Sequence, residues 1–268
     1  MFVSNSKRCH LFESIAERTW DYVARQRAAL VEPNEPGITS SIIGDVRTVY
    51  INDNHVGVWA NPGYQENING SDIDIFVEST PNNFVWYALQ AKALKINGRY
   101  MAMCHHGDYQ WIKLRRLSVN GGCIPYYLLY NGDYEYKYAG IDKCGRLFNE
   151  KQFGCSIVTL DKIESKSIDQ NNNCVPPYFT DFHPNDAEPW RVMVCCNQPN
   201  VQTYTIDQIK VYTEPYRLLS ELPPLGIEEA DVYYNFDGEG SNKLYNIAKE
   251  VDHNPGHVML FRRTTFPQ

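Results

Sequence analysis

The chain has 268 residues, which is enough to bury a substantial core without cross-links, as one large domain or two modest ones. Hydrophobic residues make up 43% of the sequence, and the 19 tyrosines argue against a disordered chain. The formal net charge of −7 excludes a global electrostatic attraction to nucleic acid, so any basic binding surface has to be local.

The N-terminal segment and the cysteines point to the cytoplasm. A secretory signal is not expected, because Glu13 and Glu17 interrupt the apolar character of the first 20 residues. No run reaches the roughly 18 apolar residues of a membrane span, so no membrane partner is expected. The eight cysteines form no C-x-x-C pair, which argues against a structural zinc site and favours reduced, buried thiols.

The N-terminal 50 residues predict two helices. Residues 11–31 show helical periodicity, and Pro33 and Pro36 end that helix. Thr39 then has the character of an N-cap, and the apolar positions of 42–50 mark a second amphipathic helix.

Three strands are expected next. Residues 56–60 are short and apolar, and 73–78 alternate until they reach a turn at 80–83. Residues 84–91 are apolar almost throughout, as expected of a strand that is buried on both faces. The Pro-Asn-Asn turn between them predicts an antiparallel hairpin.

The chain after the hairpin returns to helix and then to strand. A helix is expected over 106–118, ended by Asn120-Gly121-Gly122, and a dense strand over 124–130, followed by a turn at 131–133. This order predicts an α/β (α+β) fold with a mixed sheet and packed helices.

The second half is less regular, and no clear linker divides it, which favours one elaborated domain. Residues 156–163 are compatible with strand or helix. The remaining expectations are an exposed loop at 168–176, a core strand at 190–196, a helix that starts at Thr213-Glu214-Pro215, a turn at 238–240 and a last strand at 257–261.

One group of residues suits chemistry on a phosphodiester. Asp72 stands at the entry to one hairpin strand, and Gln90 and Lys92 lie two apart near the end of the other, so their side chains emerge on one face. Mg²⁺ prefers oxygen ligands and needs only one or two carboxylates. Lys92 can act on the attacking water or on the phosphate, and Glu66 can add a second carboxylate.

An acid, then Asp on a strand, then Gln-x-Lys on the next strand resembles the PD-(D/E)xK superfamily of restriction-endonuclease-like nucleases, in the Gln variant of Mrr-type enzymes. The chain is more closely similar to a bacterial family of unknown function within that superfamily. The resemblance covers roughly residues 10–200. The matching positions are Glu66, Gly70, Asp72, Gln90-Ala91-Lys92, Gln110 and Pro125 to Asn131.

The resemblance implies a restriction-endonuclease-like mixed central β-sheet flanked by α-helices. It implies a nuclease-like domain at 1–200, with 201–268 as a C-terminal extension packed on the same domain. Mg²⁺ or Mn²⁺ would be held by Asp72, Gln90 and Glu66, with Lys92 completing the catalytic set. The implied activity is that of a DNA endonuclease in bacterial anti-phage defence. The resemblance is compatible with a homo-oligomer and with an activating partner or ligand.

Several alternatives stay open at this point. Asp74 shares a face with Asp72, and Asp72 is preferred for its spacing after Gly70. The neutral Gln90 removes a negative charge from the site, so an inactive scaffold that binds or senses nucleic acid or a nucleotide is the second hypothesis. DNA and RNA are not distinguished. Basic residues of the helix that follows can touch phosphates or form a solvated face, namely Lys113, Arg115 and Arg116.

Overall fold

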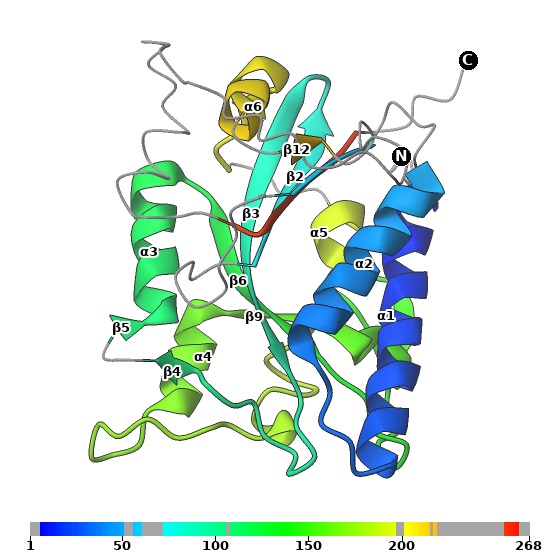
Figure 1. Cartoon of the computed structure of the whole chain (residues 1–268), viewed down its shortest axis with the longest axis vertical. Helices are drawn as coiled ribbons and strands as arrows, with labels where there is room; N and C mark the ends of the chain where they lie inside the picture. Colours follow the sequence, from blue (N-terminus) through cyan, green and yellow to red (C-terminus); the bar gives the residue numbers. More distant parts are fainter. Residues whose placement is uncertain are drawn as a thin grey trace, which may run out of the picture.

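The computed structural model describes residues 6–50, 56–60, 72–105, 108–196, 201–214, 217–218 and 255–262 (Figure 1). The helices are α1 (Ser6–Ala28), α2 (Glu35–Tyr50), α3 (Gln110–Gly121), α4 (Leu160–Ser167), α5 (Val192–Cys195) and α6 (Ile206–Thr213), with 3-10 turns η1 (Glu150–Gly154) and η2 (Phe179–Asp181). The strands are β1 (Val56–Ala60), β2 (Ile73–Thr80), β3 (Asn83–Ala93), β4 (Cys104–His105), β5 (Asp108–Tyr109), β6 (Ile124–Tyr130), β7 (Ala139–Ile141), β8 (Leu147–Asn149), β9 (Cys155–Thr159), β10 (Glu188–Pro189), β11 (Tyr204–Thr205), β12 (Arg217–Leu218) and β13 (His257–Phe261).

The centre of the fold is a mixed sheet with the order β10-β9-β6-β3-β2-β13-β1-β12, and β11 pairs with the start of β3. The β3–β6 and β13–β2 pairs are parallel, and the other pairs of this sheet are antiparallel. The predicted β2–β3 hairpin is confirmed. Mixed strand directions with flanking helices confirm the predicted α/β class.

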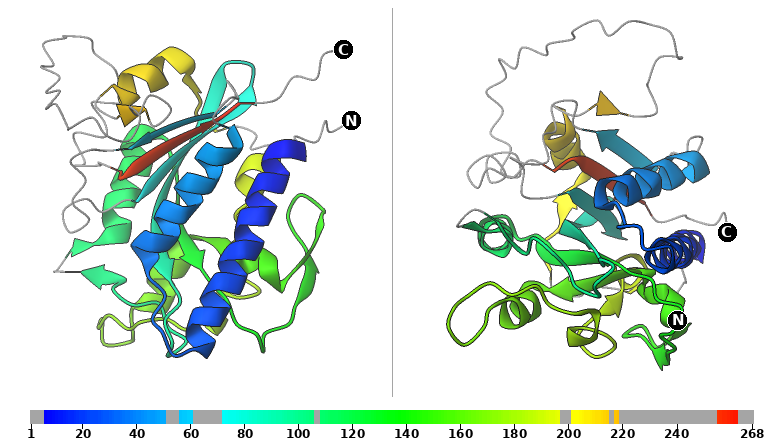
Figure 2. Two further views of the ribbon diagram at one scale, coloured as in Figure 1. Left: turned by 45° about the vertical axis from the view of Figure 1, so that its right-hand side comes forward. Right: turned by 60° about the horizontal axis from the view of Figure 1, so that its bottom comes forward.

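Helices cover both faces of the sheet (Figure 2). Buried side chains of α1 and α2, such as Phe12 and Ile42, pack on one face against Leu89 and Ala91 of β3. On the other face, α3, α4 and α6 pack around aromatic residues that include Trp86 and Trp111. No helix in the described part of the chain is long and apolar enough to cross a membrane.

Helix α2 begins at Glu35 and not after Thr39, so the predicted N-cap is wrong. Pro36 causes no break because a proline in the first turn lacks only an N–H that has no intrahelical partner. Thr39 serves tertiary packing instead, since its hydroxyl lies 2.9 Å from the Tyr130 hydroxyl in the core.

The apolar run at 190–196 is not the predicted core strand. The strand β10 comes just before it, and the chain then turns into α5. Trp190 packs against Phe12 of α1, and its indole N–H donates to the Phe12 carbonyl at 2.9 Å. A short apolar run does not distinguish a strand from a buried helix by periodicity alone, and here tertiary packing decided.

The helix predicted to begin at Thr213 instead ends there. Helix α6 starts after Thr205, whose hydroxyl and backbone form a reciprocal capping box with Gln208. The ambiguous segment 156–163 contains both elements, since β9 is followed directly by α4.

The last strand, predicted at 257–261, is confirmed as β13, and it lies inside the sheet between β1 and β2. The sequence segment predicted as an extension therefore supplies an internal strand, along with β11, α6 and β12. The domain boundary at residue 200 stays a prediction. The turn at 238–240 lies outside the described residues.

The expectation of reduced cysteines is wrong for five residues. Disulfides join Cys9 to Cys195 and Cys144 to Cys196, and Cys174 is also disulfide-bonded. The bonded partners come from distant parts of the chain, with sequence separations of 186 and 52 in the two named pairs. Sequence spacing therefore gave no sign of them. Cys123 and Cys155 are buried free thiols, as expected.

Candidate active site

Two carboxylates continue the hydrogen bonding of β3 beyond the end of its pairing with β2. That pairing reaches Asp72, whose backbone N–H donates to the Leu89 carbonyl at 3.1 Å. Strand β3 runs on to Ala93. The Ala91 N–H donates to Asp72 Oδ2 at 2.6 Å, and the Ala93 N–H donates to Glu35 Oε2 at 3.0 Å. Asp72 and Glu35 are thereby fixed at neighbouring points along one strand.

Gln90 and Lys92 meet these carboxylates from β3 itself. Because strand residues alternate between faces, both side chains emerge on the face that carries Trp86. The Gln90 Nε2 donates to Asp72 Oδ2 at 2.6 Å, and Lys92 Nζ lies 3.5 Å from Glu35 Oε1. The structure thus brings together three of the four predicted site residues. The fourth, Glu66, lies outside the described residues.

Two buried polar atoms beside this cluster lack hydrogen-bond partners among the described residues. They are the side-chain amide oxygen Oε1 of Gln90 and the hydroxyl oxygen of Tyr127. Tyr127 stands next to Gln90 in the β3–β6 register. Burial, and then the negative charges of Asp72 and Glu35, raise the pKa of Tyr127. Most buried polar atoms in proteins are paired, so unpaired oxygens on two neighbouring residues suit a polar ligand or an ion.

The donor set fits a hard divalent cation. The Asp72 carboxylate and the Gln90 amide oxygen are ligands of the kind that Mg²⁺ and Mn²⁺ prefer, with water and substrate completing the shell. In the part of the chain that the structure describes, no group of three or more His, Cys, Asp or Glu side chains is arranged to hold a metal. Among the described residues, the oxygen ligands on offer are therefore the Asp72 carboxylate and the Gln90 amide.

Glu35 is the site residue that sequence reasoning missed. It is the first residue of α2, where a carboxylate also interacts favourably with the positive end of the helix dipole. It lies 57 positions before Lys92, and no local motif connects the two. Its role follows only from the packing of α2 against the end of β3.

Asp74 has a different environment from Asp72. Its side chain is fully buried and accepts a hydrogen bond from the Tyr212 hydroxyl of α6 at 2.6 Å. Phe76 and Trp86 pack around that same tyrosine. Asp74 therefore belongs to an aromatic part of the core, whereas Asp72 contacts Gln90.

His183 is part of a buried polar network. Its Nε2 lies 2.8 Å from the Ser156 hydroxyl, and its Nδ1 lies 3.0 Å from the Phe179 carbonyl. Asn131 also donates to Ser156, at 3.0 Å. Burial lowers the pKa of His183 to about 3. Since Ser156 is fully buried, this serine–histidine pair has no access for a substrate and serves the fold.

Arg115, a candidate for phosphate contacts, is paired with acids of α4. Its guanidinium donates to Asp161 at 2.7 Å and to Glu164 at 2.8 Å. These acids offset the positive potential of α3 at this position.

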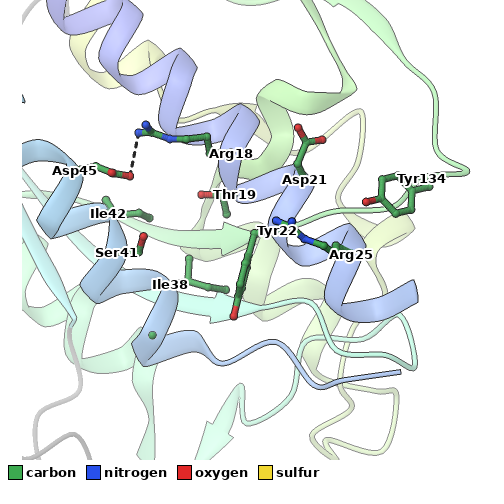
Figure 3. A pocket seen from close by; sticks show the side chains of 11 residues that line it. Arg18, Thr19, Asp21, Tyr22, Arg25, Ile38, Ser41, Ile42, Asp45 and Tyr134 are labelled. Carbon is green, nitrogen blue, oxygen red and sulfur yellow. Dashed lines mark hydrogen bonds and ion pairs between the residues drawn. The ribbon is translucent and has the colours of Figure 1, made fainter. Parts of the chain in front are cut away.

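A surface groove lies between α1 and α2 (Figure 3). It has a volume of about 760 Å³, and an ion pair between Arg18 and Asp45, with an N–O distance of 2.9 Å, crosses it. None of the predicted site residues lines this groove. The chemistry-bearing residues thus lie at the end of the β2–β3 pairing and not in the groove.

Comparison with known proteins gives one family. No curated protein and no solved structure matches the sequence. A family model, described as a family of unknown function (DUF6615), matches residues 8–263 and so includes β13 as well as the candidate site. The chain belongs to this family of unknown function.

Proposed function

We propose that the protein is a metal-dependent nuclease that hydrolyses phosphodiester bonds. The observation that supports this most is the convergence of Asp72, Gln90 and Lys92 where β2–β3 pairing ends, with Glu35 reaching the same place from α2. The resemblance of these residues to the PD-(D/E)xK pattern supports the same reaction class.

Asp72 and Gln90 are the residues that would hold Mg²⁺ or Mn²⁺, and Glu66 would add a carboxylate. Such a cation polarises the scissile phosphate and makes bound water more acidic. The hydrogen bonds from Gln90 and Ala91 fix the Asp72 carboxylate before any ligand arrives. A ligand set held in this way costs little reorganisation when substrate binds.

Lys92 supplies the positive charge of the protein in this site. Its ammonium stabilises negative charge that develops on the phosphate in the transition state, or it orients the attacking water. Glu35 holds that ammonium in place, because one carboxylate oxygen faces Lys92 and the other is fixed by the Ala93 N–H. Glu35 is therefore a positioning residue.

DNA is the proposed substrate and bacterial anti-phage defence the proposed setting, both by resemblance to the superfamily. The proposal includes a cytoplasmic location and leaves room for a homo-oligomer or an activating partner. The second candidate is an inactive scaffold that binds or senses nucleic acid or nucleotide. The neutral Gln90 favours this second candidate, because an amide in place of a carboxylate beside Asp72 removes one negative charge from the metal site.

A cleavage assay separates the two candidates. Supercoiled plasmid, single-stranded DNA and RNA are each incubated with the full chain in Mg²⁺, in Mn²⁺ and in excess chelator. The nuclease proposal predicts that at least one of these substrates is cleaved in Mg²⁺ or Mn²⁺ and is not cleaved in excess chelator. Binding of these nucleic acids without cleavage under any metal would favour the inactive scaffold.

A further inference from the structure

Four cysteines from three separate segments meet at the end of α5. Cys195 is the last residue of α5, and Cys196 follows it directly. Cys9 of α1 faces Cys195 with a Cα–Cα distance of 5.6 Å, and Cys144 faces Cys196 at 5.5 Å. Cys144, Cys195 and Cys196 pack against the hydrophobic core that α1 also packs against, and Cys9 is buried.

Contacts of Arg146 show that the three segments converge on one place. Arg146 follows Cys144 by two residues, and its guanidinium lies 3.6 Å from Cys195 Sγ and 3.1 Å from the Glu13 carboxylate. Glu13 is one helical turn after Cys9 on α1. The turn that carries Cys144 therefore touches both α1 and α5 beside their cysteines.

We propose that these four cysteines are a metal site for Zn²⁺ when they are reduced, and that the two disulfides are the oxidised form of the same centre. Tetrahedral coordination by four thiolates, with Zn–S distances of about 2.3 Å, is the usual arrangement of a structural zinc site. Sulfurs bonded in pairs are not available as ligands, so the metal site exists only in the reduced form.

The exchange between the two forms balances. A dithiol reductant gives two electrons and two protons to each disulfide and is itself oxidised to a disulfide, so two equivalents yield four thiols. Zn²⁺ then displaces four protons as the thiols become thiolates. The Arg146 guanidinium offsets part of the resulting negative charge, since its N–H groups already reach Cys195.

This centre is distinct from the candidate active site in its chemistry. Thiolates select thiophilic ions such as Zn²⁺, whereas the oxygen ligands of Asp72 and Gln90 select Mg²⁺ or Mn²⁺. The zinc centre would join the first turns of α1, the turn at 142–146 and α5, which are far apart in sequence. Its role is to hold these segments together in a reducing compartment, where disulfides do not persist.

The test uses the full chain, reduced with a phosphine and equilibrated with Zn²⁺, followed by metal analysis after gel filtration. The proposal predicts close to one zinc ion per chain and a rise in the melting temperature on adding Zn²⁺. Replacing Zn²⁺ by Co²⁺ should give thiolate-to-cobalt charge-transfer bands together with the visible bands of a tetrahedral ion. The cobalt spectrum is recorded on the wild-type chain, so it does not depend on the folding of any variant.

Variants locate the site. Cys196→Ser should weaken zinc binding by at least about 100-fold, because a lost ligand costs no less than a lost outer-shell partner. Cys155→Ser removes a buried cysteine outside the cluster and should retain zinc, as should Asp72→Asn. Absence of zinc and of the cobalt charge-transfer bands in the reduced wild type would overturn the proposal. Zinc that stays in Cys196→Ser, or an iron–sulfur chromophore in place of zinc, would overturn it as well.

Discussion

The Lys92 ammonium lies 3.5 Å from the Glu35 carboxylate. Lys92 emerges from the face of β3 that carries Trp86, whereas α2, which begins at Glu35, packs on the opposite face of the sheet. Lys92 is 6% exposed, so water screens this pair only weakly. The second Glu35 oxygen accepts the Ala93 N–H, which fixes the carboxylate from the backbone side. Lys92 is thus a buried lysine held by a carboxylate beside Asp72 and Gln90.

Glu35→Gln tests whether Glu35 positions Lys92. The glutamine can still accept the Ala93 N–H, but its charge is lost, so the variant should fold with a free energy of unfolding lower by about 2 kcal/mol. Nuclease activity should fall by at least about tenfold. Glu32→Gln is the matched control, because Glu32 also accepts a backbone N–H, from Ile96, yet is exposed and apart from Lys92. Equal activity in the two variants would contradict the assignment.

Asp72→Asn distinguishes Asp72, the residue before β2, from Asp74 within that strand. Asparagine keeps one oxygen to accept the hydrogen bonds from Gln90 and Ala91 and removes the charge that a divalent cation needs. Calorimetric titration with Mn²⁺ should show at least about tenfold weaker binding than in the wild type. Asp74→Asn, under the Tyr212 hydroxyl, should bind Mn²⁺ as the wild type does. The reverse pattern would move the metal site to Asp74.

Tyr127→Phe asks what the buried Tyr127 hydroxyl does. Because this hydroxyl has no hydrogen-bond partner among the described residues, its removal should leave the free energy of unfolding within about 0.5 kcal/mol or raise it. Activity should fall if the hydroxyl contacts substrate or water beside Gln90. A loss of stability above about 2 kcal/mol, measured by urea unfolding, would show that the hydroxyl has a structural partner instead.

The sequence was sufficient for most of the sheet and for part of the site. The spacing of Gln90 and Lys92 on one strand placed both on one face, because the side-chain period of a strand is two. The β2–β3 hairpin and β13 followed from apolar runs and turn residues. Local pattern alone determines features of this kind.

What the sequence did not reveal depends on contacts between distant segments. Glu35 became a site residue through the docking of α2 beside Lys92, and Cys9 met Cys195 across 186 residues. The run around Trp190 is apolar because it packs on α1, and its conformation follows from that packing rather than from its own periodicity.

The buried His183 predicts a component of the pH dependence of stability. Its pKa is about 3 in the folded chain, below the ordinary value of about 6.5, so the fold favours the neutral ring. The stability it contributes is complete above about pH 6.5 and is lost as the pH falls toward 3. The slope reaches about 1.4 kcal/mol per pH unit in that range.

His183→Gln removes this titration while it keeps a polar partner for Ser156. The free energy of unfolding of the variant, measured with urea between pH 7 and pH 4, should fall less steeply with decreasing pH than that of the wild type. The difference in slope corresponds to the uptake of about one proton, or about 1.4 kcal/mol per pH unit. Parallel curves for the two proteins would mean that His183 is protonated in the folded state, contrary to its buried position.

The central claim is tested most directly by the metal-dependent cleavage rate of Lys92→Met under single-turnover conditions. Methionine keeps the apolar stem and removes the ammonium, and Glu35→Gln/Lys92→Met serves as a charge-matched partner in case the single variant is unstable. The nuclease proposal predicts cleavage by the wild type in Mg²⁺ or Mn²⁺ and rates at least about 100-fold lower in both variants. Cleavage at the wild-type rate in a folded Lys92→Met protein would contradict it.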